Sequence, residues 1–525
     1  MLQRLRGLFT ETAFRYVGAK TQLLTKSTIQ SLKHTKGLPN LTVLSARQLH
    51  LSFHLRTTKD EEYLTALSKQ LKPYPIFNDP IHGIIELHPL LVKIINTTQF
   101  QRLKDIKQLG ICDYVYPGAT HTRFEHSLGT SHLCGKLIDT LHELQGEEID
   151  ITEEERLCVK IAGLCHDLGQ GPFSHFFDEV YLKMVKPELQ WKHEKASCLL
   201  FGLMLDENPK LRESFRKNGL DEEHESFIKE LIEGKQPDDK KEVTRKCKKT
   251  GKPKWFLYEI VANKQNGIDC DKFDYFARDC ANVGVITTFD HRRYFKNVRI
   301  MPVKNQLHIC VRDKEVFNLY ELFHTRWSFH HRVCQHKTKA PIEHLLAKAL
   351  QNVDQIMGIS EAVNDMKRYT LLTDSILYDI LRNESEECAV RKAKELIRRI
   401  QERKIYKFCG QTQPPSDAEC PIKDKIEKEL AEMSEGVIGK EDIFVSIVEF
   451  SYGMKEKDPV DAVTFYNKFL EHTQISKKQV SKILPKKFLE KYIRVYAKNP
   501  EQRDQVKDLF EDWCFKQGFP KTFGR

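Results

Sequence analysis

The stretch LCVKIAGLCHDLGQGPFSH, at residues 157–175, decides the fold of this chain. Its first nine residues are apolar on nearly every side, which predicts a buried helix over Leu157–Cys165. His166 and Asp167 follow at the end of this helix, and the glycines and proline after them predict a turn. A buried helix end beside a glycine turn holds side chains rigidly, so we interpret these two residues as metal ligands.

Two more candidate ligands lie elsewhere in the chain. His126 is in RFEHSLG at residues 123–129, and Asp271 is in NGIDCDKFDYFARD at residues 266–279. Two imidazoles and two carboxylates suit iron, manganese, zinc or nickel, and they leave open positions for hydrolytic chemistry. A His-Asp dipeptide alone is weak evidence in a chain with 21 His, where surface or capping histidines are the alternative. The sequence around each ligand favours the metal site.

Other titratable residues accompany these ligands. A histidine near a metal can give a proton to a leaving alkoxide, and a carboxylate can hold its tautomer. His175, Asp178 and His193 are candidates, with structural histidines as the alternative. Residues 271–279 predict a helix with a cation, a phenol and a carboxylate beside the metal ligand, or else an amphipathic helix with solvated charges.

The composition limits the classes of function. The 525 residues allow two to four domains, with 40% hydrophobic and 30% charged residues. The net charge of +10 suits phosphate-bearing ligands but does not separate nucleotides from nucleic acid. The 14 Cys form no CxxC pair, which favours free thiols in a reducing compartment. No run of 18 apolar residues predicts a membrane span, so we expect no membrane partner.

Residues 1–59 differ from the rest. They hold ten Lys or Arg and a single acid, Glu11. This composition is that of a mitochondrial transit peptide, which predicts the mitochondrial matrix. A disordered basic tail or an incorrect gene start is the alternative, with the nucleus or cytosol as the compartment. The first ordered element is expected as a short helix over residues 60–71.

The remaining pattern predicts a mainly α protein. Short alternating runs predict a hairpin over 77–87 and strands over 298–311 and 442–449, while helical spacing dominates between them. Helices are expected over 315–332 and 341–350. We expect three regions: a leader at 1–59, a helical catalytic core at 60–350 with its metal-site segment at about 120–280, and a small α+β C-terminal lobe at 351–525.

At these motifs the chain resembles the HD-domain deoxynucleoside triphosphate triphosphohydrolases, in particular the animal enzymes that join a SAM domain to an HD domain. The resemblance runs from about Phe77 to beyond Tyr496 and includes FNDPIHG, QFQRL, RFEHSLG, NGIDCDKFDYFARD and RDKEV. It implies an HD-domain helical core. It also implies metal-dependent hydrolysis of dNTPs to deoxynucleoside and inorganic triphosphate, which controls dNTP pools, with iron, manganese or zinc at the site and magnesium on the nucleotide.

The resemblance also implies residue roles. The metal ligands match His126, His166, Asp167 and Asp271, and the catalytic histidine matches His193, with His175 and Asp178 as neighbours. Either histidine can be the general acid. The substrate contacts match Gln108, Leu109, Arg123, Gln170, His175, Lys272, Tyr275, Asp279, His330 and Gln335. Among them Arg123 and Lys272 match contacts to the phosphates, and Tyr275 and Asp279 match contacts to the sugar.

Members of the family assemble as homotetramers through nucleotide effectors, GTP or dNTPs, bound between subunits. The C-terminal lobe would therefore serve effector binding and oligomerisation. The positions that match effector contacts are Asn78, Gln101, Arg102, Val115, Asp290, Arg293, Arg312, Lys314, Asn318, Arg326, His336, Lys337, Arg403, Lys407 and Lys477.

The chain departs from the family at several positions. We expect no SAM domain, because the basic segment occupies that end. Pro75 stands where the animal enzyme has an effector-binding Lys, and Asn96 stands where it has the Asp that reads guanine. These two changes predict weak or absent GTP activation. Cys334 replaces a Tyr near the sugar, which predicts weaker rejection of ribonucleotides, and Gln170 replaces a His beside the substrate.

Two other functions stay open from the sequence. One is an HD phosphohydrolase that acts on another nucleotide. The other is a catalytically weak scaffold that binds single-stranded nucleic acid weakly, suggested by the leader and by eight Lys or Arg in residues 240–254. The alternative for residues 240–254 is a solvated, mobile loop without a binding function. Aromatic residues that would stack on bases are not evident there.

Overall fold

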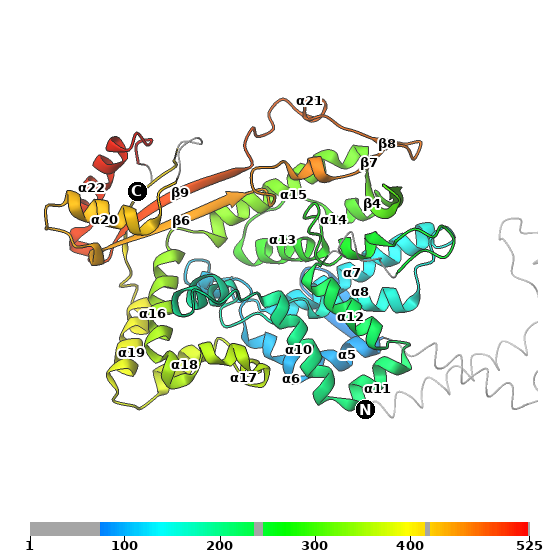
Figure 1. The fold of residues 1–525 in the computed structure, drawn as a ribbon, viewed down its shortest axis with the longest axis horizontal. Coiled ribbons are helices and arrows are strands. Elements are labelled where there is room, and N and C mark those ends of the chain that lie inside the picture. The colour runs from blue at the N-terminus through cyan, green and yellow to red at the C-terminus, as the bar shows by residue number, and fades with distance from the viewer. Residues whose placement is uncertain (1–73, 236–244, 415–419, 523–525) are drawn as a thin grey trace, which may run out of the picture. The chain divides into compact units, whose positions relative to one another are not determined.

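The structure is a computed structural model that describes residues 74–235, 245–414 and 420–522. The predicted leader and the predicted helix at 60–71 lie outside these ranges. The described part is mainly α, as predicted, with three small sheets (Figure 1). No helix within the described ranges combines the length and the apolar character that crossing a membrane requires.

Helices form most of the described chain. The long ones around the predicted metal site are α7 (Arg123–Gln145), α8 (Glu153–Cys165), α10 (His193–Glu207) and α13 (Cys270–Val283). The others in the first half are α5 (Pro89–Ile95), α6 (Thr98–Gln101), α9 (Lys183–Val185), α11 (Pro209–Lys217), α12 (Glu222–Glu233) and α14 (His291–Phe295). The second half contains α15 (Val316–Phe329), α16 (Lys339–Met357), α17 (Met366–Thr370), α18 (Ile376–Arg382), α19 (Cys388–Gln401), α20 (Lys423–Met433), α21 (Lys477–Val480) and α22 (Arg503–Lys516).

The two helices that carry the histidine ligands begin at capping boxes. Glu125 accepts from the backbone of Thr122 at the start of α7, and Glu155 does the same for Thr152 at the start of α8. α8 contains the predicted buried helix and is apolar on most of its surface. It packs closely on α7 because Gly163 lies against the Cys134 side chain, where an added Cβ would sit 2.8 Å from the sulfur. The ends of these helices are therefore fixed relative to each other.

The sheets confirm the predicted strands. β1 (Ile76–Asp79) and β2 (Gly83–Glu86) form the expected hairpin. β3 (Val298–Val303) pairs antiparallel with β4 (Gln306–Arg312), which pairs parallel with β7 (Phe465–Tyr466), next to β8 (His472–Thr473). The third sheet has the order β5 (Lys407–Thr412), β9 (Leu489–Ala497), β6 (Ile443–Ser451), all antiparallel.

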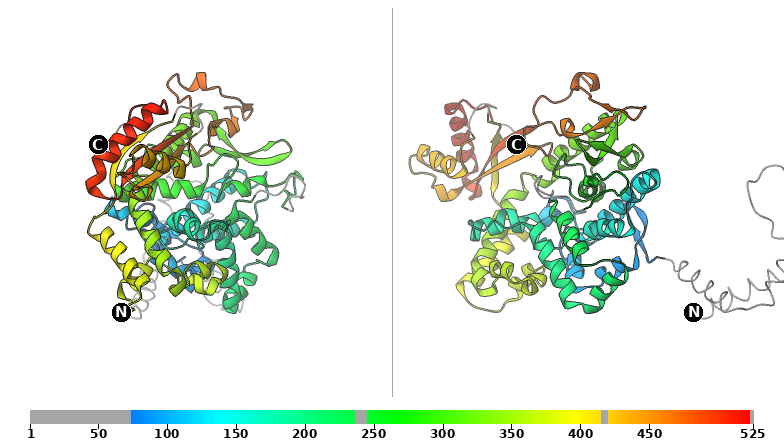
Figure 2. Two further views of the ribbon diagram at one scale, coloured as in Figure 1. Left: turned by 60° about the vertical axis from the view of Figure 1, so that its left-hand side comes forward. Right: turned by 45° about the vertical axis from the view of Figure 1, so that its right-hand side comes forward.

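The C-terminal sheet has a small core of its own. The buried residues of this core lie between Cys409 and Cys514, and most come from β5, β6, β9, α20 and α22. The helices α20 and α22 cover one face of the sheet (Figures 1 and 2). Residues 359–406, including Tyr369 and Ile397, instead belong to the main hydrophobic core. The predicted C-terminal lobe at 351–525 thus contains residues of the main core as well as a sheet with a core of its own.

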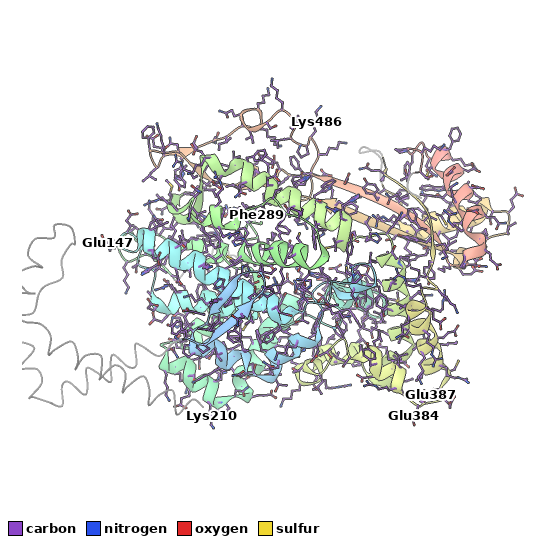
Figure 3. The ribbon with its side chains drawn as sticks, turned by 180° about the vertical axis from the view of Figure 1, so that it is seen from behind. Glu147, Lys210, Phe289, Glu384, Glu387 and Lys486 are labelled. Atoms are coloured by element: carbon purple, nitrogen blue, oxygen red, sulfur yellow. The ribbon has the colours of Figure 1, made fainter. Side chains whose placement is uncertain are left out.

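Lys486, in the loop that leads into β9, and Glu384, between α18 and α19, lie at opposite edges when the molecule is seen from behind (Figure 3). In the described part of the basic segment, Lys246, Lys248 and Lys249 are exposed, as predicted for a solvated loop, but Lys254 is buried. Lys254 is only 2% exposed, and its ammonium lies 2.9 Å from a Glu155 oxygen. A buried lysine requires such a partner, so this end of the segment is structural.

Candidate active site

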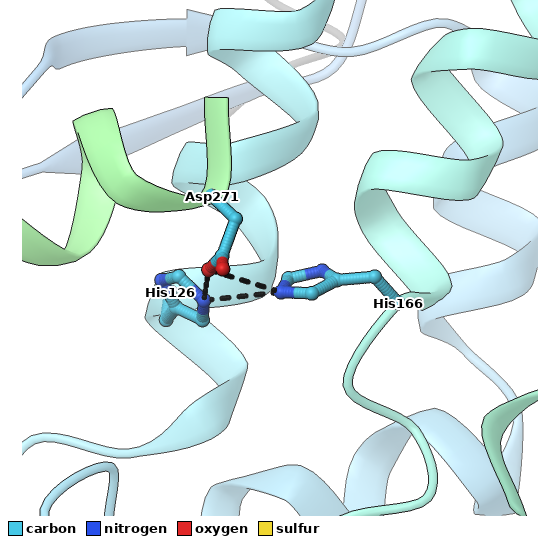
Figure 4. Close-up of side chains that lie close together, drawn as sticks. All are labelled: His126, His166 and Asp271. Atoms are coloured by element: carbon cyan, nitrogen blue, oxygen red, sulfur yellow. Dashed lines mark hydrogen bonds and ion pairs between the residues drawn. The ribbon is translucent and has the colours of Figure 1, made fainter. Parts of the chain in front are cut away.

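Three of the four predicted metal ligands, His126, His166 and Asp271, meet between α7, the end of α8 and the start of α13 (Figure 4), and Asp167 lies beside the two histidines. His126 Nε2 lies 3.2 Å from His166 Nε2 and 3.1 Å from Asp271 Oδ1. Asp167 Oδ2 lies 3.5 Å from His126 Nε2 and 3.4 Å from His166 Nε2. A metal about 2.1 Å from each donor requires neighbouring donors about 3.0–3.4 Å apart. The separations therefore fit one metal ion.

The tautomers of both histidines also fit a metal. Nδ1 of His126 donates to Asp274 Oδ2 at 2.8 Å, and Nδ1 of His166 donates to the Gly163 carbonyl at 2.9 Å. With the proton on Nδ1, each Nε2 directs a lone pair toward the other. Two facing lone pairs and two carboxylates require a cation between them. Such outer hydrogen bonds are how metal-binding histidines are usually held.

The electrostatics of the site favour a cation strongly. Burial lowers the pKa of His126, but hydrogen bonds and charge from Asp271 and Asp274 outweigh burial and raise this pKa to about 10. The carboxylate field that favours a proton on this imidazole also favours a divalent metal in its place. The donor set of nitrogen and oxygen atoms suits iron, manganese or zinc.

A buried network behind His126 holds it in place. Asp274 accepts from Arg278 at 2.9 Å and from His82 Nε2 at 2.7 Å, and Arg278 also donates to Asp79 at 2.9 Å. This network needs α7 and α13 to approach closely at Gly129. A Cβ added at Gly129 would sit 1.8 Å from Asp274 Oδ1, so only glycine fits there.

The predicted catalytic residues form a second cluster beside the metal ligands. Asp178 is in a π-helix at Phe177–Leu182, and His193 is the first residue of α10. His193 Nδ1 donates to Asp178 Oδ2 at 2.8 Å, and the His175 ring lies edge-on to the His193 ring at 5.3 Å. Burial lowers the pKa of His193, but the bond to Asp178 outweighs it and raises this pKa. His193 thus keeps Nε2 for a proton that it can give away.

All ten predicted substrate residues line one cavity of about 560 Å³. Three metal ligands, His166, Asp167 and Asp271, line the same cavity, as does His193. Within it, Asp279 is held by His121, whose Nε2 donates to Asp279 Oδ1 at 2.7 Å. A cavity of this size with charged walls suits a nucleotide.

The cations predicted to face phosphate have acceptors already. Arg123 donates to Asp167 Oδ2 at 2.5 Å, to Ser174 Oγ at 2.9 Å and to the Gln108 carbonyl at 3.1 Å. Lys272 lies 3.0 Å from Asp269 Oδ2. Their side chains are fixed before any ligand arrives, so little ordering entropy is lost on binding.

Two of the departures from the family pattern also lie in this cavity. Gln170 is fully buried and donates to Asp167 Oδ1 at 3.2 Å, so its amide orients a metal ligand. Cys334 ends a π-helix at His330–Cys334. Such helices are frequent at functional sites.

Sequence reasoning missed several residues of the cavity wall. Arg326, predicted as an effector contact, lines the catalytic cavity, and its guanidinium donates to the Ser451 carbonyl at 2.5 Å. Lys339 also lines it and pairs with Glu343 at 2.9 Å. No motif marked Lys339, although it follows Gln335 by only four residues. The remaining missed residues are Glu179, Glu194, Ile232, Ala262, Lys264 and Phe329.

The predicted effector residues are spread more widely. Asp290, Arg293, Lys314 and Asn318 line a second, more exposed cavity of about 430 Å³. The others lie elsewhere: Asn78 and Lys407 are exposed, Gln101, Val115, Arg312, His336 and Lys337 are partly buried, Arg403 donates to the Tyr114 carbonyl, and Lys477 lies 3.0 Å from Asp458.

Arg102, predicted as an effector contact, is buried among backbone carbonyls. It is 5% exposed, and its guanidinium donates to the carbonyls of Leu168 at 2.9 Å and Leu372 at 2.6 Å. Two further carbonyls, of Gln170 and Thr370, complete its hydrogen bonds. Four of its five N–H groups thus donate to backbone carbonyls, which leaves at most one for a nucleotide.

A helical core with two histidines and two aspartates around one metal position defines an HD-domain protein. The HD domain model indeed matches residues 123–268. The chain is 47% identical over 472 residues to "Deoxynucleoside triphosphate triphosphohydrolase SAMHD1" of Gallus gallus, covering 85% of this chain and 76% of that protein. The Homo sapiens protein of that name is 44% identical over 468 residues, covering 85% of this chain and 74% of that protein.

A more distant relative agrees. A "Deoxynucleoside triphosphate triphosphohydrolase SAMHD1 homolog" of Dictyostelium discoideum is 37% identical over 445 residues, covering 84% of this chain and 80% of that protein. The chain therefore belongs to the HD-domain deoxynucleoside triphosphate triphosphohydrolases.

Proposed function

We propose that this protein hydrolyses dNTPs to deoxynucleoside and inorganic triphosphate and so controls dNTP pools. The observation that carries the proposal is the single cavity that contains all ten predicted substrate residues next to the metal ligands. The names of the relatives supply the substrate class. Five cations in the wall, Arg123, Lys264, Lys272, Arg326 and Lys339, match the charge of a triphosphate.

The residues divide the reaction between them. His126, His166, Asp167 and Asp271 would hold a divalent metal, which would supply a water of lowered pKa and Lewis-acid polarisation of a phosphoryl oxygen. The bond between the α-phosphorus and the sugar O5′ breaks as the water oxygen bonds to phosphorus. The leaving O5′ needs a proton, and His193, whose Nδ1 is held by Asp178, has Nε2 free to give one.

The sugar end of the cavity sets the choice between deoxyribose and ribose. Asp279, held by His121, accepts from a sugar hydroxyl, and Tyr275 lies on the same face of α13. Cys334 is small, so its side of the cavity leaves room near a 2′ position. We therefore propose weaker rejection of ribonucleotides than a Tyr at this position would give.

Regulation by nucleotides forms the second part of the proposal. Asp290, Arg293, Lys314 and Asn318 supply two cations, a carboxylate and an amide around one cavity, which suits a nucleotide effector. We propose that a second subunit completes this site in a homotetramer and that a dNTP binds there more effectively than GTP. Iron, manganese or zinc would occupy the HD site, with magnesium on the nucleotide phosphates.

Release of inorganic triphosphate from each dNTP, with effectors varied separately, tests the proposed function. The purified chain with manganese should release triphosphate, and Asp167→Ala should not. Hydrolysis of another nucleotide instead would favour a different HD phosphohydrolase. Retained binding of single-stranded nucleic acid without any turnover would favour a scaffold.

A further inference from the structure

Asp374, just before α18, bridges two loops that border the catalytic cavity. Its Oδ2 accepts the Lys107 N–H at 3.0 Å, and its Oδ1 accepts the Phe173 N–H at 2.5 Å. Lys107 immediately precedes Gln108, and Phe173 lies two residues before His175; both Gln108 and His175 line the cavity. One carboxylate therefore ties together the loops that carry two substrate residues.

The loop that carries His175 needs such support. Phe173 and Ser174 have φ of 60° and 59°, two consecutive left-handed residues that are not glycine. This conformation is costly for residues with a side chain, and it persists only where the surroundings enforce it. Ser174 Oγ donates to the Lys107 carbonyl at 2.6 Å and accepts from Arg123 Nε at 2.9 Å, which joins the same two loops again.

The close approach of the two loops is independent evidence for the arrangement. A Cβ added at Gly110 would sit 2.5 Å from the Phe173 carbonyl oxygen, and Gly110 has φ of +57°. The loop of residues 107–110 thus lies directly against the loop of residues 171–175. A small shift of either loop would move Gln108 relative to His175.

The chain around Asp374 makes further contacts with the turn after the metal ligands. Tyr369 Oη donates to the Gly169 carbonyl at 2.8 Å. Arg102 links the carbonyls of residues 168 and 170 to those of residues 370 and 372. Residues 369–374 therefore brace the whole turn from the metal ligands to His175.

We propose that Asp374 is a positioning residue for the hydrolysis, which acts by fixing His175 and Gln108 relative to each other. The proposal rests on the proposed function. A carboxylate is suited to this role because each of its oxygens accepts one N–H, whereas an asparagine side chain offers only one acceptor. A displacement of about 1 Å in a positioned group can cost about 100-fold in rate.

The test compares kcat and KM for triphosphate release by Asp374→Ala and Asp374→Asn. We expect kcat of Asp374→Ala to fall about 10–100-fold with a smaller change in KM. Asp374→Asn, which keeps one acceptor, should fall less and should fold where the Ala variant does not. Combined with His175→Ala, the Asp374→Asn change should add less than about twofold, because both variants disable one unit.

A matched control separates positioning from general stability. Glu259 is 4% exposed and accepts from the Ile309 N–H at 2.7 Å and from His308 at 2.6 Å, outside the cavity wall. Glu259→Ala should lower Tm while leaving kcat per folded molecule within about twofold. The role of Asp374 is refuted if its variants lose no more kcat than this control, or if their effect multiplies fully with His175→Ala. A wild type without triphosphate release would instead refute the proposed function and this role together.

Discussion

The catalytic cavity and the predicted effector region differ in how much of each site one chain completes. In the catalytic cavity, ten predicted residues line one space, and each aspartate donor lies within 3.5 Å of both imidazole Nε2 atoms. In the effector region, four of fifteen predicted residues share one exposed cavity. Arg102 donates to backbone carbonyls, and Arg326 lines the catalytic cavity.

This difference indicates which of the two predicted sites a single chain can bring together. Within the described residues, one chain brings all the predicted hydrolytic residues together, and hydrogen bonds hold several of their side chains. The effector cavity has charged residues but open sides, as expected of half a site. Catalysis should therefore depend on local geometry, and regulation should depend on assembly.

Loss of one metal ligand should have the largest effect. We expect Asp271→Ala to lose about four orders of magnitude in triphosphate release, as deletion of one member of a catalytic unit does. Metal content per chain should fall with it, measured by elemental analysis. Asp290→Ala, in the effector cavity, is the matched aspartate and should keep its metal. An Asp271→Ala variant with metal and turnover intact would contradict the comparison.

The next effect concerns the proton donor. His193→Ala should lower kcat by about 100–10,000-fold, the range for general acid catalysis. Because Asp178 raises the pKa of His193, the protonated form persists to higher pH. Asp178→Asn should therefore move the alkaline limb of the kcat profile to lower pH. If His175→Ala removes that limb and Asp178→Asn leaves it in place, His175 is the acid.

A gain of function tests the regulatory half of the comparison. Pro75→Lys with Asn96→Asp should introduce activation by GTP, through a charged phosphate contact and a matched acceptor for guanine. Each is worth about 1–3 kcal/mol, so the GTP concentration for half activation should fall about tenfold or more. Turnover and tetramer content with and without GTP measure this. Strong GTP activation of the unchanged chain would refute the expectation.

The smallest effect is expected at the sugar. Cys334→Tyr should fill space beside the 2′ position and raise the ratio of dATP to ATP turnover by about tenfold. The dATP rate itself should change little, which separates selectivity from damage to the site. Equal ratios in both proteins would mean that another residue rejects the ribose.

The residues predicted for the catalytic site lie together in the structure, and the sequence signals that marked them are local. Apolar spacing marked the helix before His166, and the motifs around His126 and Asp271 fixed the other ligands. The resemblance then supplied the ten cavity residues. The HD match and the named relatives confirm the family, while the individual roles of these residues stay predictions.

The structure also shows contacts that could not be predicted from the sequence, because no local pattern records them. A sequence shows that Arg102 is a cation, but not that four carbonyls surround it. It shows charge near Lys254, but not its burial beside Glu155. The helical spacing after residue 351 does not show that residues near Tyr369 pack into the main core. Each of these contacts depends on which segments, distant in the sequence, pack against each other in the fold.

Gly129 constrains how this protein can change over evolutionary time. A helical glycine costs about 0.5–1 kcal/mol relative to alanine, yet any side chain there would collide with Asp274. A more stable helix α7 is therefore reachable only after Asp274 has already been replaced, and that replacement would free His126 to rotate. Neither the replacement of Gly129 nor the replacement of Asp274 is tolerated before the other. The pair is therefore locked together, and the glycine should outlast most of the surface around it.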